Sequence, residues 1–159
     1  MRIRPEAPRD QDAIHTVHRR AFPGEDEARL VDDLRRDGNA AISLVAETER
    51  GIVGHILFSR LQAPLRALAL APLAVGPEAQ GQGIGSALVR AGLDRAVAEG
   101  WDAVFVLGEP AFYGRFGFSA EEAKSFACVY GGEHFMVRLF GKTVDYGILI
   151  YPAAFAILG

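Results

Sequence analysis

The sequence contains little cysteine and no long apolar run. Cys128 is the only cysteine among 159 residues, so no internal disulfide framework can form, and the chain suits a reducing compartment. No stretch reaches the roughly 18 uninterrupted apolar residues that a membrane-spanning helix needs. Residues 1–5 are not followed by the apolar core of a signal peptide. We therefore expect a soluble, cytoplasmic protein with no membrane partner.

The chain also lacks an excess of positive charge. Its formal net charge is −3, from 17 Lys and Arg against 20 Asp and Glu. A protein that follows nucleic-acid phosphates normally carries a basic face, so we expect no nucleic-acid partner. Half of the residues are hydrophobic and 23% are charged, which excludes a disordered or fibrous chain. The length corresponds to a single domain over residues 1–159.

The spacing of apolar residues predicts a mixed sheet with helices packed on it, which is the α/β class. Strands are expected at residues 2–4, 41–47, 52–60, 65–75, 103–107, 126–130, 134–140 and 147–151. Helices are expected at residues 9–22, 26–37 and 109–116, and a longer helix opens within residues 80–86 and extends to residue 99. Asp10 is the expected N-cap of the first helix.

One of the expected strands contains a proline. Pro72 interrupts the apolar run of residues 65–75. Proline has no backbone N–H to donate to a ladder, so this strand must bulge or leave the sheet near Pro72. A splayed strand exposes unpaired N–H and C=O groups, and a ligand can pair with them as an added strand does.

The segment that follows this strand is rich in glycine. Residues 80–86 have the sequence Gln-Gly-Gln-Gly-Ile-Gly-Ser and lead from the strand into a helix. The first turn of a helix leaves backbone N–H groups unpaired and carries partial positive charge. Glycines remove the side chains that would keep an anion away from the backbone. The pattern predicts a pyrophosphate cradle, while the simpler interpretation is a tight strand-to-helix turn.

The type of pyrophosphate ligand is a separate question. The segment has no P-loop lysine, which excludes ATP or GTP bound in that mode. A dinucleotide fingerprint is a closer alternative, because Gly81-x-Gly83-x-x-Ser86 nearly matches it and Glu109 follows the next strand, where a ribose-binding acid belongs. That fingerprint usually opens a fold, however, whereas two helices and a hairpin precede it here. The chain after it is also too short for a second mononucleotide-binding half.

Two motifs in order resemble the GNAT acetyltransferase superfamily. The string Gln80-x-x-Gly83-x-Gly85 after a bulged strand is similar to that family's acyl-CoA signature. The segment 110–118, Pro-Ala-Phe-Tyr-Gly-Arg-Phe-Gly-Phe, is similar to its second signature, a tyrosine followed by a Gly-Phe pair. One predicted strand separates the two motifs, as the family pattern expects, and the hairpin strand with Val-Gly-His at residues 53–55 also fits.

The resemblance covers residues 1–140, and residues 141–159 are expected to form a C-terminal strand and tail. It implies a central, mostly antiparallel, bulged sheet flanked by helices. It also implies similarity to bacterial N-acetyltransferases whose substrates are mostly unassigned. The implied activity is direct transfer of an acetyl group from acetyl-CoA, the co-substrate, to a primary amine in a ternary complex, without a metal. The amine is a small molecule or a peptide that the sequence does not identify.

The resemblance also implies roles for individual residues. The backbone of three residues would pair with the pantetheine arm: Leu73, Ala74 and Val75. Seven residues would surround the pyrophosphate: Gln80, Gly81, Gln82, Gly83, Ile84, Gly85 and Ser86. Tyr113 would lie near the thioester sulfur and protonate the departing thiolate. The alternative is that Tyr113 packs in the core beside Phe112 and Phe116.

Direct transfer needs a neutral amine, and hence a base or a water chain that accepts a proton. Some family members place this base on the bulged strand, but residues 65–75 contain no carboxylate. The remaining candidates are Glu47, His55, Glu109 and His134. Glu109 follows the strand before Tyr113 and is the candidate we select, although it alternatively caps the short helix. We expect His55 to be a structural histidine and His134 to be exposed.

Three further features have ordinary structural interpretations. The acidic run 25–27, together with Asp32 and Asp33, is a solvated helix face or, alternatively, an acidic rim that attracts a cationic amine. Cys128 packs as a small hydrophobe rather than carrying an acyl group. The apolar tail 148–158 either packs on the domain or forms a homodimer contact.

Two alternatives to the enzyme remain. An acyl-CoA-binding regulatory module would keep the cradle without catalysis, and the missing carboxylate on the bulged strand supports it. A nicotinamide- or flavin-binding protein would use the same glycine segment for a dinucleotide.

Overall fold

The computed structural model describes residues 1–141 and 146–158. The strands in these residues are β1 (Arg2–Pro5), β2 (Ala40–Thr48), β3 (Gly51–Arg60), β4 (Ala67–Val75), β5 (Ala103–Leu107), β6 (Phe126–Ala127), β7 (Phe135–Leu139) and β8 (Gly147–Ile148). They form a six-stranded sheet in the order β1-β2-β3-β4-β5-β7 and a two-stranded sheet of β6 and β8. Of the pairings described in the larger sheet, only β4 with β5 is parallel. The predicted mixed α/β class with a mostly antiparallel sheet is confirmed.

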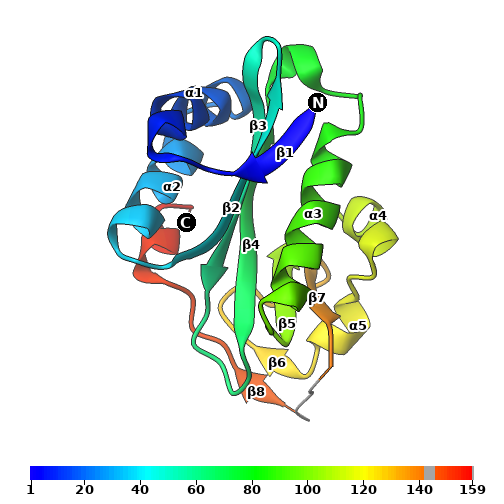
Figure 1. Ribbon diagram of the computed structural model, residues 1–159. Coiled ribbons are helices and arrows are strands. Elements are labelled where there is room, and N and C mark those ends of the chain that lie inside the picture. The colour runs from blue at the N-terminus through cyan, green and yellow to red at the C-terminus, as the bar shows by residue number, and fades with distance from the viewer. Residues whose placement is uncertain (142–145, 159) are drawn as a thin grey trace.

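Helices cover both faces of the larger sheet (Figure 1). The α-helices are α1 (Gln11–Ala21), α2 (Asp26–Arg36), α3 (Ile84–Ala98), α4 (Pro110–Tyr113) and α5 (Ala120–Ala123). The 3-10 helices are η1 (Pro8–Asp10), η2 (Pro77–Ala79), η3 (Gly114–Phe116) and η4 (Ala153–Leu158). Successive side chains of a strand point to opposite faces. On β3, Phe58 accordingly packs into the core under α3, whereas Leu57 packs into the core under α1 and α2. The sheet therefore separates two apolar cores.

The predicted bulge at Pro72 is confirmed. Leu70 lies opposite Phe58 of β3 and Leu73 lies opposite Ile56, so Ala71 and Pro72 together face a single residue of β3. The pairing of β4 with β5 covers only the first four residues of β4 and ends at Leu70. Beyond the bulge, β4 therefore keeps its neighbour on the β3 side and has separated from β5.

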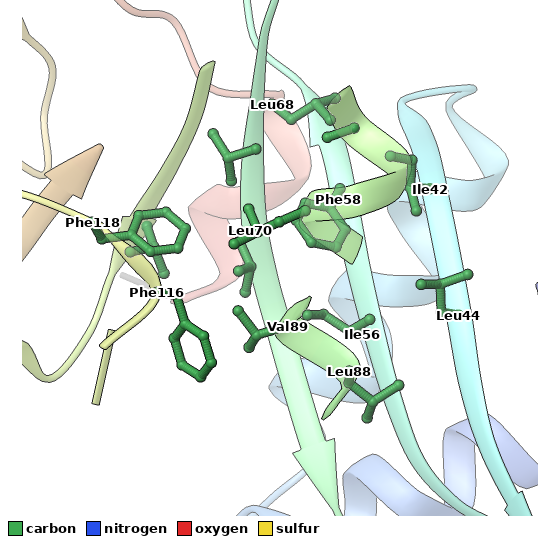
Figure 2. Packing of buried hydrophobic residues seen from close by; sticks show 14 of the residues in the cluster. Ile42, Leu44, Ile56, Phe58, Leu68, Leu70, Leu88, Val89, Phe116 and Phe118 are labelled. Atoms are coloured by element: carbon green, nitrogen blue, oxygen red, sulfur yellow. The ribbon is translucent and has the colours of Figure 1, made fainter. Parts of the chain in front are cut away.

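The middle of α3 packs directly on Phe58 of β3, and Figure 2 shows Phe58 in one cluster with Leu88 and Val89 of this helix. A Cβ atom added to Gly92 would lie 2.2 Å from Cε1 of Phe58, whose ring is fully buried. Leu88 and Val89 of the same helix are also fully buried in this core. Gly92 thus permits the helix to approach the Phe58 ring more closely than any side chain would.

Several predicted elements are shorter than expected. The strand predicted at 126–130 is only β6, because a turn closed by the Gly131 N–H donating to the Cys128 carbonyl ends it. Of the strand predicted at 147–151, only residues 147–148 form a strand, β8, which pairs with β6, and Ile150 adds an isolated antiparallel bridge to Gln62. The helix predicted at 109–116 is α4 followed by a 3-10 turn, and Gly117, at φ +88°, ends that turn. The helix α5 was not predicted.

Asp10 is the N-cap residue of α1, as predicted, but its side chain makes no capping hydrogen bond. Its carboxylate instead accepts hydrogen bonds from the Arg4 guanidinium and from the backbone N–H of Ala7. The ion pair holds the pKa of Asp10 down at about 2. This buried pair joins β1 to the start of α1.

The C-terminal segment packs on the rest of the protein. Phe155 of η4 is 3% exposed and belongs to the core under α1 and α2, and η4 lies beside α2 (Figure 1). Of the predicted segment 141–159, residues 142–145 and 159 lie outside the described residues. Among the helices that the structure describes, none combines the length and apolar character that a membrane crossing requires.

Candidate active site

The glycine segment forms an open loop at the start of α3. Gly81 and Gly83 have φ of +78° and +82°, the left-handed region that glycine adopts without strain. Gly83 is the N-cap of α3, and a Cβ atom added to Gly81 or Gly83 would meet no described atom within 4 Å. The unpaired N–H groups of the first turn of α3 therefore adjoin open space, as an anion site requires.

The free edge of β4 leads into this loop. Residues 73–75 pair with β3 on one side and follow the point where β5 has separated on the other. The Gln80 side-chain amide donates a hydrogen bond of 2.9 Å to the Val75 carbonyl, which ties the loop to the end of the strand. The segment 73–75 and the cradle thus form one continuous edge of backbone.

The second motif lies beside the first. A Cβ atom on Gly85 would lie 3.8 Å from Cγ2 of Val75 and 4.0 Å from Cζ of Phe112. The Arg115 guanidinium donates a hydrogen bond of 3.2 Å to the Ser86 hydroxyl and lies 5.5 Å from the Phe112 ring centroid. Arg115 therefore places a positive charge at the start of α3. No role was predicted for Arg115, although it lies inside the second motif.

Tyr113 lies at the end of α4, against the turn that follows β5. A Cβ atom on Gly108 would lie 2.5 Å from Cε2 of Tyr113, so the ring covers the backbone of Gly108. It also makes edge-to-face contacts with Phe112 and Phe118, at centroid distances of 4.9 and 5.7 Å. Burial raises the pKa of Tyr113 to about 12, so the phenol is protonated at neutral pH and can donate a proton or hydrogen bond.

Glu109 and His134 both adjoin Gly108, Glu109 as the next residue in the chain and His134 through hydrogen-bond contacts. The Glu109 carbonyl accepts hydrogen bonds from the N–H groups of Phe112 and Tyr113, and its side chain is exposed and makes no cap to α4. His134 is exposed, as predicted, and its Nδ1 lies 3.2 Å from the Gly108 carbonyl. Glu109 therefore starts α4 through its backbone, which leaves its carboxylate available.

The other two base candidates are engaged elsewhere. Glu47 forms an ion pair of 3.0 Å with Arg4. His55 is fully buried between α1 and the sheet, with Nδ1 2.8 Å from Nε2 of His18 and Nε2 2.8 Å from the Ser43 hydroxyl. The prediction that His55 is structural is confirmed.

This buried chain of polar groups continues to the edge of α2. Ser43 donates a hydrogen bond to Glu6, which Arg35 also contacts at 2.9 Å. Burial opposes the ionisation of Glu6, but the hydrogen bonds from His55 and Ser43 outweigh it, and the pKa of Glu6 is lowered. Burial lowers the pKa of His18 to about 3, so this ring is neutral at physiological pH.

The acidic residues of α2 and Cys128 agree with their ordinary interpretations. Asp33 and Asp32 form ion pairs with Arg36 and Arg35, as a solvated helix face does. Cys128 is half-buried and packs against the core under α1 and α2, and burial raises the pKa of its thiol. Within residues 1–141 and 146–158, no three His, Cys, Asp or Glu side chains gather where they could hold a metal ion.

Comparison with known proteins identifies the family. The model of the acetyltransferase (GNAT) family matches residues 11–118. The chain is 40% identical to the uncharacterized N-acetyltransferase YhbS of Escherichia coli K12 over 136 residues, which cover 83% of this chain and 81% of that protein. It is 44% identical to the uncharacterized N-acetyltransferase YjhQ of the same organism over 117 residues, or 69% of this chain and 64% of that one.

A solved structure agrees over nearly the whole chain. The crystal structure of Escherichia coli YhbS in complex with CoA superposes with a TM-score of 0.92 at 36% identity, over 99% of this chain and 93% of that one. The chain belongs to the GNAT family of acetyltransferases, and it is an enzyme of the N-acetyltransferase class. The dinucleotide-binding alternative is wrong, because it requires a doubly wound parallel sheet and the described sheet has one parallel pair.

Proposed function

We propose that this protein binds acetyl-CoA along the free edge of β4 and transfers its acetyl group directly to a primary amine. The observation that carries the proposal is the continuous edge of backbone that runs from residues 73–75 into the glycine cradle. A pantetheine arm carries amide groups that can pair with such an edge as an added strand does. The cradle at the N-terminus of α3 suits the pyrophosphate that follows.

The similar proteins support this ligand. YhbS was crystallised with CoA, and a GNAT family acetyltransferase of Brucella melitensis was crystallised in complex with acetyl-CoA. The Brucella protein is 33% identical to this chain, with a TM-score of 0.83 and coverage of 97% of both chains. In our proposal, Arg115 adds a positive charge beside the phosphates, through its position next to Ser86.

Tyr113 is the proposed general acid. Acetyl-CoA supplies the acetyl group as a thioester. The amine nitrogen bonds to the acetyl carbon, the carbon–sulfur bond breaks, and the sulfur takes a proton from the Tyr113 hydroxyl. The raised pKa of Tyr113 ensures that the proton is present before transfer. The exposed carboxylate of Glu109 is the proposed acceptor, directly or through water, of the proton that the amine loses.

A regulatory acyl-CoA-binding module is the second candidate. The observation that favours it is the absence of a carboxylate on β4, which leaves Glu109 as the nearest acidic residue in the chain to Tyr113. Family membership favours the enzyme over this module, and turnover of an amine tests the preference directly.

Two further predictions, on cellular location and on dimerisation, accompany the proposal. A single cysteine fits a reducing compartment such as the cytoplasm. A homodimer contact through the C-terminal tail would have to use the part of the tail that does not pack on α2, including the exposed side chains of Ile148 and Ile150.

Thermal unfolding with and without ligand tests the proposal. CoA or acetyl-CoA at about 100 times its dissociation constant is expected to stabilise the fold by about 2.7 kcal/mol. For a chain of this size the midpoint then rises by about 5–11 °C. NAD, NADP and ATP serve as controls and are expected to produce little change. A shift with NAD and none with CoA would overturn the ligand assignment, and CoA binding without turnover of any amine would favour the regulatory module.

A further inference from the structure

A cavity of about 230 Å³ lies where β4 and β5 separate. Leu70, Ala71 and Leu107 line it from the sheet side. Leu70 is the last β4 residue paired with β5, Ala71 begins the bulge, and Leu107 ends β5. Gly108, on which the Tyr113 ring lies, is the next residue. Through Leu107, the cavity therefore adjoins the backbone that the Tyr113 ring covers from the α3 side of the sheet.

The far wall of the cavity is aromatic and comes from the C-terminal part of the chain. Tyr130, Tyr151, Phe155 and Leu158 line it. Tyr151 makes edge-to-face contacts with Tyr130 and with Phe155, at centroid distances of 4.8 and 5.1 Å. The Tyr130 hydroxyl donates a hydrogen bond of 3.4 Å to the Phe155 carbonyl. These contacts hold the rings against one another and form a preshaped apolar wall.

The lining side chains carry no charge. None of the seven lining residues is acidic or basic, and burial raises the pKa of both tyrosines, so their phenols are neutral at physiological pH. A polyamine or an amino acid would have to leave a second charge without a partner in this cavity. A cavity of roughly 150 Å³ with apolar walls is known to hold benzene, so this one accommodates a single ring or a short branched chain.

An apolar cavity also bears on the chemistry of the amine. Desolvation disfavours the charged form of a buried amine and lowers its pKa. The neutral form is the nucleophile in the proposed reaction. In such a cavity the amine is more often neutral already, so a strong base is less necessary. This is consistent with the exposed position of Glu109, the proposed base.

We propose that the acetyl acceptor is a small primary amine with an apolar carbon skeleton, aromatic or branched aliphatic, and no second charge, and that this cavity holds the skeleton. The proposal rests on the proposed acetyl transfer. A larger hollow of about 540 Å³ is not the acceptor site, because it lies around α5 and residues 131–135 and contains no residue of β4, β5 or the cradle.

The first test measures kcat/KM by thiol release from acetyl-CoA over a panel of amines. Phenethylamine and isoamylamine are expected to exceed spermidine and lysine by at least about tenfold, because each of the latter brings an additional charge into an apolar site. A preference for spermidine or lysine would overturn the proposal and leave acetyl transfer itself established.

Two variants locate the effect in the cavity. Leu107 and Leu158 are 52% and 42% exposed, so their replacement need not disturb the core. Leu107→Glu and Leu158→Trp are each expected to lower kcat/KM for phenethylamine by at least about tenfold, by adding a charge or filling space, without changing CoA affinity. The control is Val97→Glu, at a position 55% exposed on α3 and outside the cavity, and it is expected to change neither quantity. Unchanged phenethylamine kinetics in both cavity variants would overturn the proposal.

Binding without turnover separates the two hypotheses. Calorimetry measures the affinity of the CoA-saturated protein for phenethylamine, which does not depend on catalysis. Binding that Leu107→Glu weakens, without transfer to any amine, would retain the cavity and overturn the proposed enzyme activity. Transfer to amines, with phenethylamine neither bound nor preferred, would retain the activity and overturn the cavity.

Discussion

The helix α3 contains two glycines, Gly85 in its first turn and Gly92 in its middle, and their surroundings differ. At Gly92 the missing side chain is replaced by the Phe58 ring, 2.2 Å from where a Cβ atom would lie. At Gly85 a Cβ atom would make ordinary contacts of 3.8 and 4.0 Å, and the backbone does not require glycine because its φ is not positive. Alanine would favour the helix there by up to about 1 kcal/mol.

The difference shows that packing requires glycine at position 92, whereas nothing in the protein itself requires glycine at position 85. The fold accounts for Gly92 completely. Gly85 lacks a reason within the described atoms and lies in the same turn as Ser86 and next to the open cradle, so a ligand that approaches the helix start would account for it. The same helix thus packs against the sheet in its middle and, in our proposal, binds the ligand at its beginning.

The largest effect is expected at the packed glycine. Gly92→Ala would place a methyl group inside the Phe58 ring, which is fully buried and has no free space to enter. We expect a loss of about 3 kcal/mol in the free energy of unfolding, at the upper end of overpacking effects. Urea unfolding measures it, with Gly85→Ala as the matched control in the same helix. Equal stability of the two variants would remove the contrast between the glycines.

The next effect is expected at the ligand end of the helix. Gly85→Val adds a branched side chain where we expect phosphate oxygens, and it is expected to abolish the stabilisation of about 2.7 kcal/mol that saturating CoA confers. Without CoA, the free energy of unfolding should change by no more than about 1 kcal/mol, the range of helix propensities. Calorimetry measures CoA affinity in both proteins. Wild-type affinity in the valine variant would show that the cradle lies elsewhere.

Local signals predicted much of this organisation. Pro72 indicated the bulge and the glycine segment indicated the start of α3. Proline restricts the backbone and glycine frees it wherever they occur, so both signals can be recognised without the fold. His55 was correctly expected to be structural. Gly92 carried no such signal, since its reason lies on β3 and only the fold brings Phe58 beneath it.

The cavity could not be predicted for a related physical reason. Leu107, Tyr130 and Tyr151 are far apart in the sequence, and the apolar tail was compatible with packing or with dimerisation. The strands predicted at 126–130 and 147–151 were too long because their residues favour strands, while the continuous pairing between these two segments spans only two residues of each. Both the cavity and the lengths of these two strands depend on how segments distant in the sequence pair and pack.

The buried histidines make the stability of the packed region depend on pH, and this dependence can be measured. Burial lowers the pKa of His18 to about 3 in the folded protein, against about 6.5 when unfolded. Stability is therefore complete above about pH 6.5 and falls as the pH drops toward 3, because the unfolded chain binds the proton first. Between pH 7 and pH 5, His18 alone should cost about 2 kcal/mol, and His55, whose pKa burial also lowers, adds a loss of the same sign.

Urea unfolding at the two pH values measures this loss, and CoA affinity should not follow it. The buried carboxylates do not interfere, since the pKa values of Glu6 and Asp10 are lowered from already acidic values. His18→Gln, which keeps an amide to hydrogen-bond with His55, should lose the His18 part of the dependence, while His55, whose pKa burial also lowers, keeps its own part. A wild-type free energy of unfolding that is the same at pH 7 and pH 5 would contradict a neutral buried His18.

The smallest expected effect in free energy concerns Tyr113, where packing and chemistry meet in one side chain. The ring contacts Gly108, Phe112 and Phe118, and Tyr113→Phe retains all of these contacts while removing only the hydroxyl. If the hydroxyl protonates the departing thiolate, kcat should fall at least about tenfold, which corresponds to about 1.4 kcal/mol. This is below the usual range for a general acid because water can replace the hydroxyl in part.

The control for Tyr113 is Tyr146→Phe, at a side chain 71% exposed, which should leave kcat unchanged. Thiol release with a good amine measures the rate, and calorimetry and thermal unfolding measure CoA affinity and stability, which should stay the same in Tyr113→Phe. A purely structural tyrosine predicts the reverse pattern, with turnover kept and any change confined to stability. Equal turnover in Tyr113→Phe and wild type would therefore assign Tyr113 to packing, in the same class as Gly92 rather than Gly85.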